Sequence, residues 1–206
     1  MQTVLIETVA IALAAYALGS VSFAVVVSKA MGLPDPRSHG SHNPGATNVL
    51  RTGNKLAAAL TLIGDAGKGA LAVALTVLYT GESAIAGFDA PLAGAMALLG
   101  HLYPVFHGFK GGKGVATAAG VLLSLSLVLG LGTLLTFGII VFFFRMISLA
   151  SIIAAVFAAF WAWFLFGLTP ITPAVAAIAL LVVWRHRDNI LRIMRGAEPR
   201  LGEKKA

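Results

Sequence analysis

Long uncharged apolar stretches alternate along the chain with short polar segments, a pattern typical of a protein that crosses a membrane several times. The clearest apolar stretches are 4–28, 56–80, 91–107, 146–168 and 172–184. About 20 apolar residues in a helix span a hydrocarbon core of roughly 30 Å, so each stretch has the length of a transmembrane helix. The pattern therefore predicts an all-α, polytopic membrane protein.

The uncharged stretch 115–144 is too long for one span. A single helix of this length would measure about 45 Å at 1.5 Å per residue, and would need extreme tilt to fit a bilayer. Two short spans hinged near Gly130 and Gly132 fit better. With this division, the chain is predicted to contain seven transmembrane helices.

Charged residues predict the orientation of these spans, because cytoplasmic loops collect Lys and Arg. With seven spans and the N-terminus outside, the Lys and Arg residues of the loops and the basic tail all lie on the cytoplasmic side. The outer segments then hold Glu7, Glu82 and Asp89. Six spans would leave either Lys113 or Arg145 on the wrong side. We predict an outer N-terminus, a cytoplasmic C-terminus and a retained first span.

Composition agrees with a membrane protein. Hydrophobic residues make up 58% of the chain, charged residues 11%, and mean hydropathy is +0.90, whereas soluble domains are roughly 25% charged. The net charge of +7 favours anionic lipids and anionic substrates as partners, with no nucleic acid. Because cysteine is absent, thiolate metal sites and cysteine acyl-enzymes are excluded.

The first polar cluster, 32–53, is dense in Gly, Pro, Asn, Ser and Thr. This composition supplies turns and free backbone N–H groups, which together can form an anion-binding site. Ser41, Thr47 and Asn48 add neutral donors, and Arg51 adds a planar fork suited to phosphate. The alternative interpretation is a plain surface loop.

A second cluster places Asp65 and Lys68 about ten residues into the second span. Residues three apart share a helix face, so the two side chains can neutralise each other. Ionisable groups at this depth are costly and often functional. A structural ion pair and a functional one both remain open here.

The third cluster, 100–117, places Lys110 and Lys113 beside glycines that let a phosphate approach the backbone. A helix beginning near Gly114 would present its N-terminal N–H groups to that phosphate. The segment does not fit the GxxxxGK[ST] pattern of nucleotide-binding loops. His101 and His107 lack the spacing of a zinc site, so we expect no metal and interpret each as a satisfied polar group.

The tail from residue 185 onward is also polar, and it is predicted to lie on the cytoplasmic side with the three clusters. His186 and Asn189 are three apart and would share a face at the cytoplasmic end of the last span. Ser148 emerges on this side as well. The neighbouring arginines are expected to contact anionic headgroups: Arg185, Arg187, Arg192 and Arg195.

These strings resemble the PlsY family of bacterial membrane acyl-phosphate:glycerol-3-phosphate acyltransferases. The similarity covers nearly the whole chain, in order, through GSVSFAVVVSK at 19–29, GSHNPGATNVLR at 40–51, DAGKG at 65–69, GHLYPVFHGFKGGKGVAT at 100–117 and HRDNILR at 186–192. The resemblance implies a single acyltransferase domain, 1–206, in the bacterial inner membrane, with its site facing the cytoplasm. It implies acyl transfer from acyl phosphate to the 1-hydroxyl of glycerol 3-phosphate, giving lysophosphatidic acid and phosphate without a cofactor. It also implies a link to the soluble acyl-phosphate synthase PlsX.

The resemblance further implies roles for individual residues. The catalytic ones would be Ser41, Arg51, Lys113, His186 and Asn189. Ser41, Thr47, Arg51 and the glycines after Lys110 would hold acyl phosphate, and Lys113, Ser148, His186 and Asn189 would hold glycerol 3-phosphate. The implied substrate-binding residues are Gly40, Asn43, Gly45, Thr47, Asn48, Lys110, Gly111, Gly112, Gly114 and Ser148.

The expected chemistry is direct transfer. Acyl phosphate already has a good leaving group, so an enzyme can work by holding two phosphates close and aligning the hydroxyl. None of the five His residues has Asp five positions later, so the HxxxxD acid/base pair of other glycerolipid acyltransferases is absent. A substrate phosphate or His186 would accept the proton, and Ser41 is the rival nucleophile. An anion transporter or a membrane scaffold are alternatives, but neither explains three Gly-rich clusters on one side.

Overall fold

The structure, a computed structural model, describes residues 2–81 and 83–203, and its regular elements in these ranges are all helical. The longer helices are α1 (Gln2–Gly19), α4 (Lys55–Thr80), α6 (Asp89–Leu102), α7 (Val115–Leu125), α8 (Leu127–Phe144), α9 (Ile147–Phe166) and α10 (Ile171–Arg185). The shorter elements are α2 (Phe23–Ala30), α3 (Ala46–Val49), η1 (Leu50–Thr52), α5 (Ser83–Ala86), η2 (Val105–His107) and α11 (Arg187–Met194).

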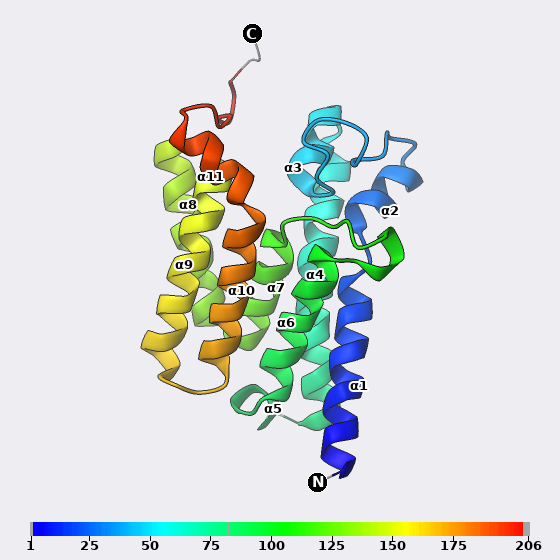
Figure 1. Cartoon of the computed structure of the whole chain (residues 1–206), viewed down its shortest axis with the longest axis vertical. Helices are drawn as coiled ribbons and strands as arrows, with labels where there is room; N and C mark the ends of the chain where they lie inside the picture. The colour runs from blue at the N-terminus through cyan, green and yellow to red at the C-terminus, as the bar shows by residue number, and fades with distance from the viewer. Residues whose placement is uncertain (1, 82, 204–206) are drawn as a thin grey trace.

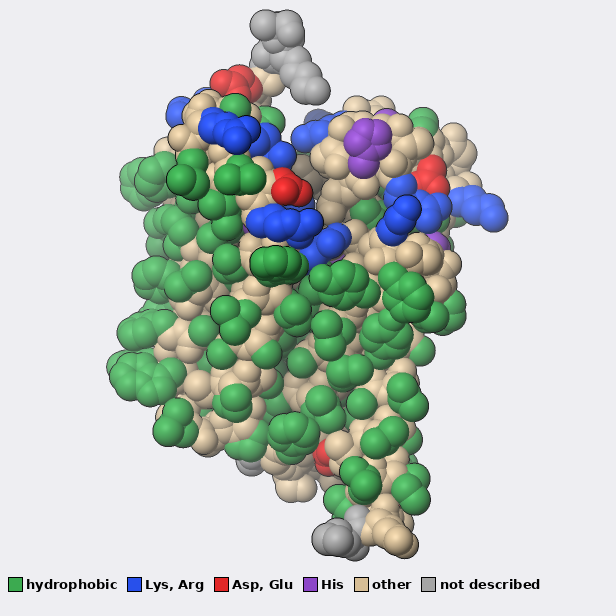
Figure 2. Space-filling model, in the orientation of Figure 1, with side chains coloured by type: hydrophobic (Ala, Val, Ile, Leu, Met, Phe, Trp, Pro, Cys, Tyr) green, Lys and Arg blue, Asp and Glu red, His purple; other side chains and the backbone are tan. Residues whose placement is uncertain are grey.

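The longer helices run along the long axis of the molecule, with α7 between the α1–α4–α6 group and the α8–α9–α10 group (Figure 1). Helices α2, α3 and α11 lie at the upper end in this view, and the N-terminus and α5 lie at the lower end. The first polar cluster and the polar tail, predicted from segments far apart in the sequence, therefore lie at the same end of the bundle. Lys and Arg side chains gather at that end, above a largely apolar surface (Figure 2).

Several helices have the length and composition of membrane spans. Four segments qualify by themselves: Gln2–Ala30, Lys55–Thr80, Leu127–Phe144 and Ile147–Phe166. Helices Val115–Leu125 and Ile171–Arg185 are apolar but shorter. Large apolar side chains on these helices are exposed, as expected where lipid replaces water around the bundle.

The stretch 115–144 forms two helices as predicted, but the position of the predicted hinge was wrong. The chain turns at Ser126, which has an extended backbone and whose hydroxyl accepts a hydrogen bond from Leu129 N at 3.3 Å. Gly130 lies inside α8, where a Cβ atom would sit 2.6 Å from Leu123 Cα. Gly130 therefore permits close packing of α7 on α8, and Gly132 also continues the helix.

The first predicted span, 4–28, is interrupted. Helix α1 ends at Gly19, α2 begins at Phe23, and the Val21 carbonyl in the gap accepts a hydrogen bond from Lys68 Nζ at 2.6 Å. A buried ammonium from α4 thus satisfies a carbonyl that the helix break leaves without its usual partner. This contact joins residues 47 positions apart.

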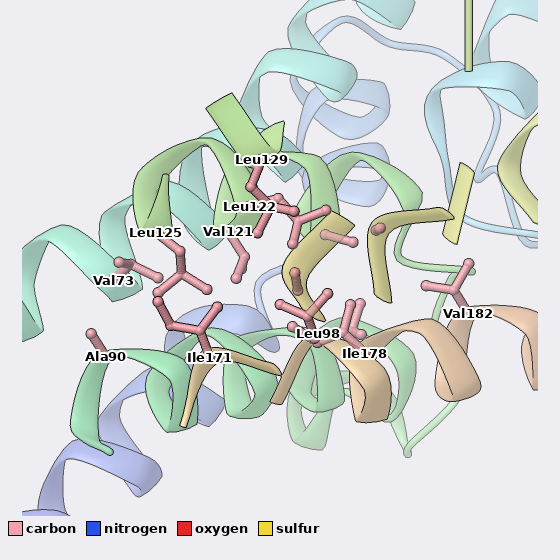
Figure 3. Close-up of a cluster of buried hydrophobic side chains, with 14 of the residues drawn as sticks. Val73, Ala90, Leu98, Val121, Leu122, Leu125, Leu129, Ile171, Ile178 and Val182 are labelled. Carbon is pink, nitrogen blue, oxygen red and sulfur yellow. The ribbon is translucent and has the colours of Figure 1, made fainter. Parts of the chain in front are cut away.

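Small residues let the helices approach closely. A Cβ at Gly100 would lie 2.2 Å from the Tyr16 carbonyl oxygen, and one at Gly120 would lie 1.9 Å from that of Ala66. Such close approach is a common way to pack helices in a membrane, where burial of apolar surface gives little driving force. Between α4, α6, α7, α8 and α10, buried apolar side chains fill the remaining space (Figure 3): Val73, Ala90, Leu98, Val121, Leu122, Leu125, Leu129, Ile171, Ile178 and Val182.

Acidic residues that were predicted to lie on the outer side are found at the lower end where described. Thr8 Oγ1 in α1 donates a hydrogen bond to Asp89 Oδ1 at the start of α6, at 3.1 Å. Glu7 is adjacent to Thr8 in the same helix. Glu82 lies outside the described residues.

Candidate active site

The first polar loop is organised around Asn48. Its amide donates both protons to backbone carbonyls, to Pro36 O at 2.6 Å and to His39 O at 3.1 Å, while its Oδ1 accepts from Ser41 N at 3.0 Å. The side chain is buried. Asn48 therefore holds the loop together, and its predicted use as a donor to substrate was wrong because it has no free proton.

Arg51 projects from η1 beside the same loop. Its Nη1 would lie 3.2 Å from a Cβ at Gly40, whose φ of +61° also favours glycine. Within the described part of the chain, the Arg51 guanidinium forms no ion pair or hydrogen bond, and it is exposed. Ser41 and Thr47 are exposed as well. A free, forked cation next to a glycine is well placed to bind a phosphate.

The glycines of the third cluster pass directly under the first loop. Gly112 N donates to His101 O at 3.1 Å, and a Cβ at Gly112 would lie 2.9 Å from Pro44 O. Gly111 is equally confined, since its Cβ would lie 2.1 Å from His101 O. These two positions need glycine because backbone from two other segments occupies the space of a side chain. The structure thus brings the first and third clusters together.

Residues 111–113 (the turn), which lie between η2 and α7, are joined to the C-terminal end of α10 by Arg185. Its Nη2 donates to Gly111 O at 2.8 Å and its Nε donates to Gly112 O at 3.0 Å, and the guanidinium lies 5.6 Å from the centre of the Tyr103 ring. The prediction that Arg185 contacts lipid headgroups was wrong, because its fork is used inside the protein. Nothing in its sequence spacing indicates this partner.

Lys113 connects the turn to the tail. Lys113 Nζ donates to Asn189 Oδ1 at 2.6 Å, and Asn189 Nδ2 donates to Glu198 Oε1 at 2.6 Å. Glu198 Oε2 accepts from Arg192 Nε at 2.7 Å. Arg192 is therefore paired with a carboxylate, and its contact with anionic headgroups stays a prediction. Glu198 was missed from the sequence, where it is one of three acidic residues in a basic tail and nothing distinguishes it from Asp188 and Glu203.

The pKa values of Lys113 and Glu198, which both bind Asn189, are lower than usual. Burial lowers the pKa of Lys113 to about 8, despite the nearby Glu198 carboxylate. Burial raises the pKa of Glu198, but the hydrogen bonds from Asn189 and Arg192 outweigh this effect and hold it below its ordinary value. Lys113 is thus charged at neutral pH and close to its titration range. A partly desolvated ammonium of this kind interacts strongly with an anion that enters the site.

His186 lies between α10 and α11 and is buried. Its Nδ1 is 2.8 Å from Val182 O, and since a carbonyl can only accept, Nδ1 carries the proton. Burial, together with the Lys113 charge, lowers the pKa of His186 to about 4. The ring is therefore neutral at physiological pH, and Nε2 is a hydrogen-bond acceptor.

The remaining predicted residues lie around this core. Ser148, in the first turn of α9, is buried near Glu198, and its hydroxyl makes no hydrogen bond with any described residue. Gly114 begins α7 with φ of +79°, and a Cβ there would meet Leu98. Lys110 is exposed, while Asn43 and Gly45 are half-buried beside Pro44. Ser41 forms no hydrogen bond with an imidazole among these residues.

The predicted pair Asp65–Lys68 is confirmed as an ion pair of 2.9 Å, buried between helices. Asp65 Oδ1 is also 3.5 Å from His101 Nδ1, and that nitrogen lies 3.2 Å from Thr117 Oγ1. His101 is thus a satisfied buried group, as predicted. The network supports the helix break at Val21 on one side and the Gly112 turn on the other.

Comparisons with known proteins identify the class of this site. A sequence profile described as glycerol-3-phosphate acyltransferase matches residues 9–196. The chain belongs to the glycerol-3-phosphate acyltransferase family. It is 57% identical over 194 residues to a glycerol-3-phosphate acyltransferase of Cupriavidus taiwanensis, with 94% of this chain and 96% of the relative covered. A Ralstonia nicotianae member is 58% identical over 205 residues, covering 100% and 99%.

Solved structures of a glycerol-3-phosphate acyltransferase share the fold. PlsY (YgiH), described as an integral membrane glycerol 3-phosphate acyltransferase, matches in its glycerol 3-phosphate form with a TM-score of 0.88 and 37% identity, over 95% of this chain and 96% of that one. Its lysophosphatidic acid form matches with a TM-score of 0.87 and 36% identity over the same shares. The resemblance predicted from the sequence is confirmed, and the chain is a membrane acyltransferase by family.

Proposed function

We propose that this protein transfers a fatty acyl group from acyl phosphate to the 1-hydroxyl of glycerol 3-phosphate, releasing lysophosphatidic acid and inorganic phosphate. This is the first acylation of phospholipid synthesis. The observation that carries the proposal is the approach of two segments that each hold a cation. Gly112 packs against Pro44 in the loop of Arg51, which has no ion-pair partner among the described residues, and Lys113, next to Gly112, binds Asn189. A reaction between two phosphate-bearing substrates needs two such segments.

Each group has a defined task in this proposal. Arg51, with Ser41 and Thr47, binds the acyl-phosphate group, and Lys113, Asn189 and Ser148 bind the phosphate of glycerol 3-phosphate. Holding both substrates in one site supplies most of the catalysis, because the donor is already activated. As the carbonyl carbon is attacked, positive charge nearby stabilises the oxyanion and the departing phosphate.

The proton of the attacking hydroxyl needs an acceptor. His186 Nε2 is free to accept a hydrogen bond from the hydroxyl, and this orients the nucleophile. With a pKa of about 4, the imidazole is a weak base. The departing phosphate is the better final acceptor, and His186 serves to align the hydroxyl.

The whole chain, 1–206, acts in this proposal as one domain of the bacterial inner membrane. Seven segments cross the bilayer: α1 with α2, then α4, α6, α7, α8, α9 and α10. The N-terminus lies outside and the basic end faces the cytoplasm, where PlsX delivers acyl phosphate. The positive-inside tendency supports this orientation, since Lys and Arg gather at the end opposite the N-terminus (Figure 2).

The test is an assay of purified protein with glycerol 3-phosphate and either acyl phosphate or acyl-CoA as donor. We expect lysophosphatidic acid and one equivalent of phosphate from acyl phosphate, and little product from acyl-CoA. A Lys113→Met variant serves as the matched negative control. Product formed mainly from acyl-CoA would overturn the assignment of the donor.

A further inference from the structure

Arg185 is the last residue of α10 and lies one position before His186. Its guanidinium binds two successive carbonyls, Gly111 O at 2.8 Å and Gly112 O at 3.0 Å, and it lies against the ring of Tyr103. The Tyr103 carbonyl in turn accepts a hydrogen bond from Tyr16 at 2.6 Å. A planar fork held against an aromatic ring has little freedom, so it fixes the two carbonyls firmly.

These two hydrogen bonds determine the direction of the peptide planes that precede Lys113. In a trans peptide, N–H and C=O point in opposite directions. With both carbonyls turned toward Arg185, the N–H groups of Gly112 and Lys113 turn away from it. Gly112 N–H meets His101 O at 3.1 Å, whereas Lys113 N–H forms no hydrogen bond with any described residue. A glycine backbone would not keep this arrangement unaided.

Arg185 also sets the distance between the turn and the tail. From the end of α10, it holds Gly111 and Gly112, while Asn189 in α11 receives Lys113 Nζ at 2.6 Å. Helices α10 and α11 thus form hydrogen bonds with three consecutive residues, 111–113. Without the fork, the Lys113 ammonium has only the Asn189 contact to hold it in place.

We infer that Arg185 is a positioning residue, which orients the 111–113 backbone so that the Lys113 ammonium and its free N–H bind the phosphate of glycerol 3-phosphate. This role rests on the proposed function and adds to it a residue that touches no substrate. Lysine cannot replace this arginine, because an ammonium lacks the planar fork that binds two carbonyls at once.

The test compares Arg185→Lys with Arg187→Lys in purified protein. Arg187 is the matched control, because its side chain is 52% exposed and stacks on Trp184 outside the site. Calorimetry gives the Kd for glycerol 3-phosphate, initial rates give KM and kcat, and thermal unfolding reports the fold. Arg185→Gln provides a second variant that can replace only one of the two bonds.

We expect Arg185→Lys to raise both Kd and KM for glycerol 3-phosphate about tenfold, with kcat changed less than about threefold and Tm close to wild type. Arg187→Lys should match wild type. Values of Kd and KM within about twofold of wild type would overturn the inference, as would loss of folded protein in both Arg185 variants, which indicates scaffolding only. The Kd comparison tests the positioning role of Arg185 even if the wild-type protein forms no product. Product formation by the wild-type protein tests the proposed function separately.

Discussion

Lys113 is the side chain whose chemistry depends most on its surroundings. Burial lowers its pKa to about 8, so it loses its charge well below the ordinary range of a lysine. We predict that kcat/KM for glycerol 3-phosphate falls as pH rises through about 8, because kcat/KM reports the groups of the free enzyme. Rates measured across pH with Lys113→Arg provide the check. An arginine stays protonated, so its alkaline limb should move upward, and an unchanged limb would assign the titration to another group.

Arg51 is expected to act as a fork and not only as a charge. Arg51→Lys should lose activity by roughly 10²-fold, or about 2.7 kcal/mol, because a lysine cannot bind phosphate through two parallel hydrogen bonds. The comparison is kcat/KM for acyl phosphate at equal amounts of folded protein. Arg37→Lys is a control from the same loop, since Arg37 pairs with Asp35 at 2.6 Å. Near-normal activity in Arg51→Lys would make Arg51 a headgroup anchor.

The sequence indicated which residues belong to the candidate site, but it did not indicate which partners those residues contact. Ser41, Arg51, Lys113 and Asn189 stand in recognisable strings, so the sequence predicts a role for each, and the structure adds the Lys113–Asn189 contact. The partner of Asn189 could not, because Glu198 meets it through the fold of the tail. The donors of Asn48 looked available in the sequence but are used inside the loop, which only the coordinates of Pro36 and His39 reveal.

Helix α4 contains the buried Asp65–Lys68 ion pair, so its stability depends on keeping both charges. Asp65→Asn would leave Lys68 buried without its counter-ion, and breaking a buried pair costs about 3–5 kcal/mol. We predict a large fall in Tm for this variant in detergent. The double variant Asp65→Asn with Lys68→Met should regain much of it, because no buried charge remains. Equal destabilisation by the single and double changes would show that the Val21 contact of Lys68 dominates.

The long apolar helices were predictable from hydropathy, but the residues at which they end were not. The division of 115–144 follows from the length that a bilayer allows, whereas the turn at Ser126 depends on a hydroxyl cap and on the packing of Gly130 against Leu123. The gap at Val21 depends on Lys68, which lies far away in the sequence. Local composition predicts spans, and contacts between helices decide where they stop.

The proposed reaction requires the basic end of the whole molecule to face the cytoplasm. Cysteine at position 38 is a clean probe, because Ser38 is exposed and the chain has no cysteine of its own. In Ser38→Cys, an impermeant maleimide should label inside-out vesicles and leave intact spheroplasts unlabelled. Thr169→Cys, in the exposed turn between α9 and α10, should give the opposite result. Labelling of position 38 from outside would reverse the orientation.

In the proposed reaction, both phosphate-bearing substrates occupy one site and the acyl group moves directly between them. A covalent relay would add a step without making the attack on an activated donor easier. The geometry agrees, since the Ser41 hydroxyl has no imidazole partner among the described residues. An acyl-enzyme on Ser41 would therefore need a serine that has no hydrogen-bonded imidazole to take its proton.

The most direct measurement is the initial rate of lysophosphatidic acid formation by purified protein, with acyl phosphate and glycerol 3-phosphate varied against each other. Direct transfer through a ternary complex predicts double-reciprocal lines that intersect. Parallel lines, the pattern of a ping-pong cycle with a covalent acyl-enzyme, would contradict the account.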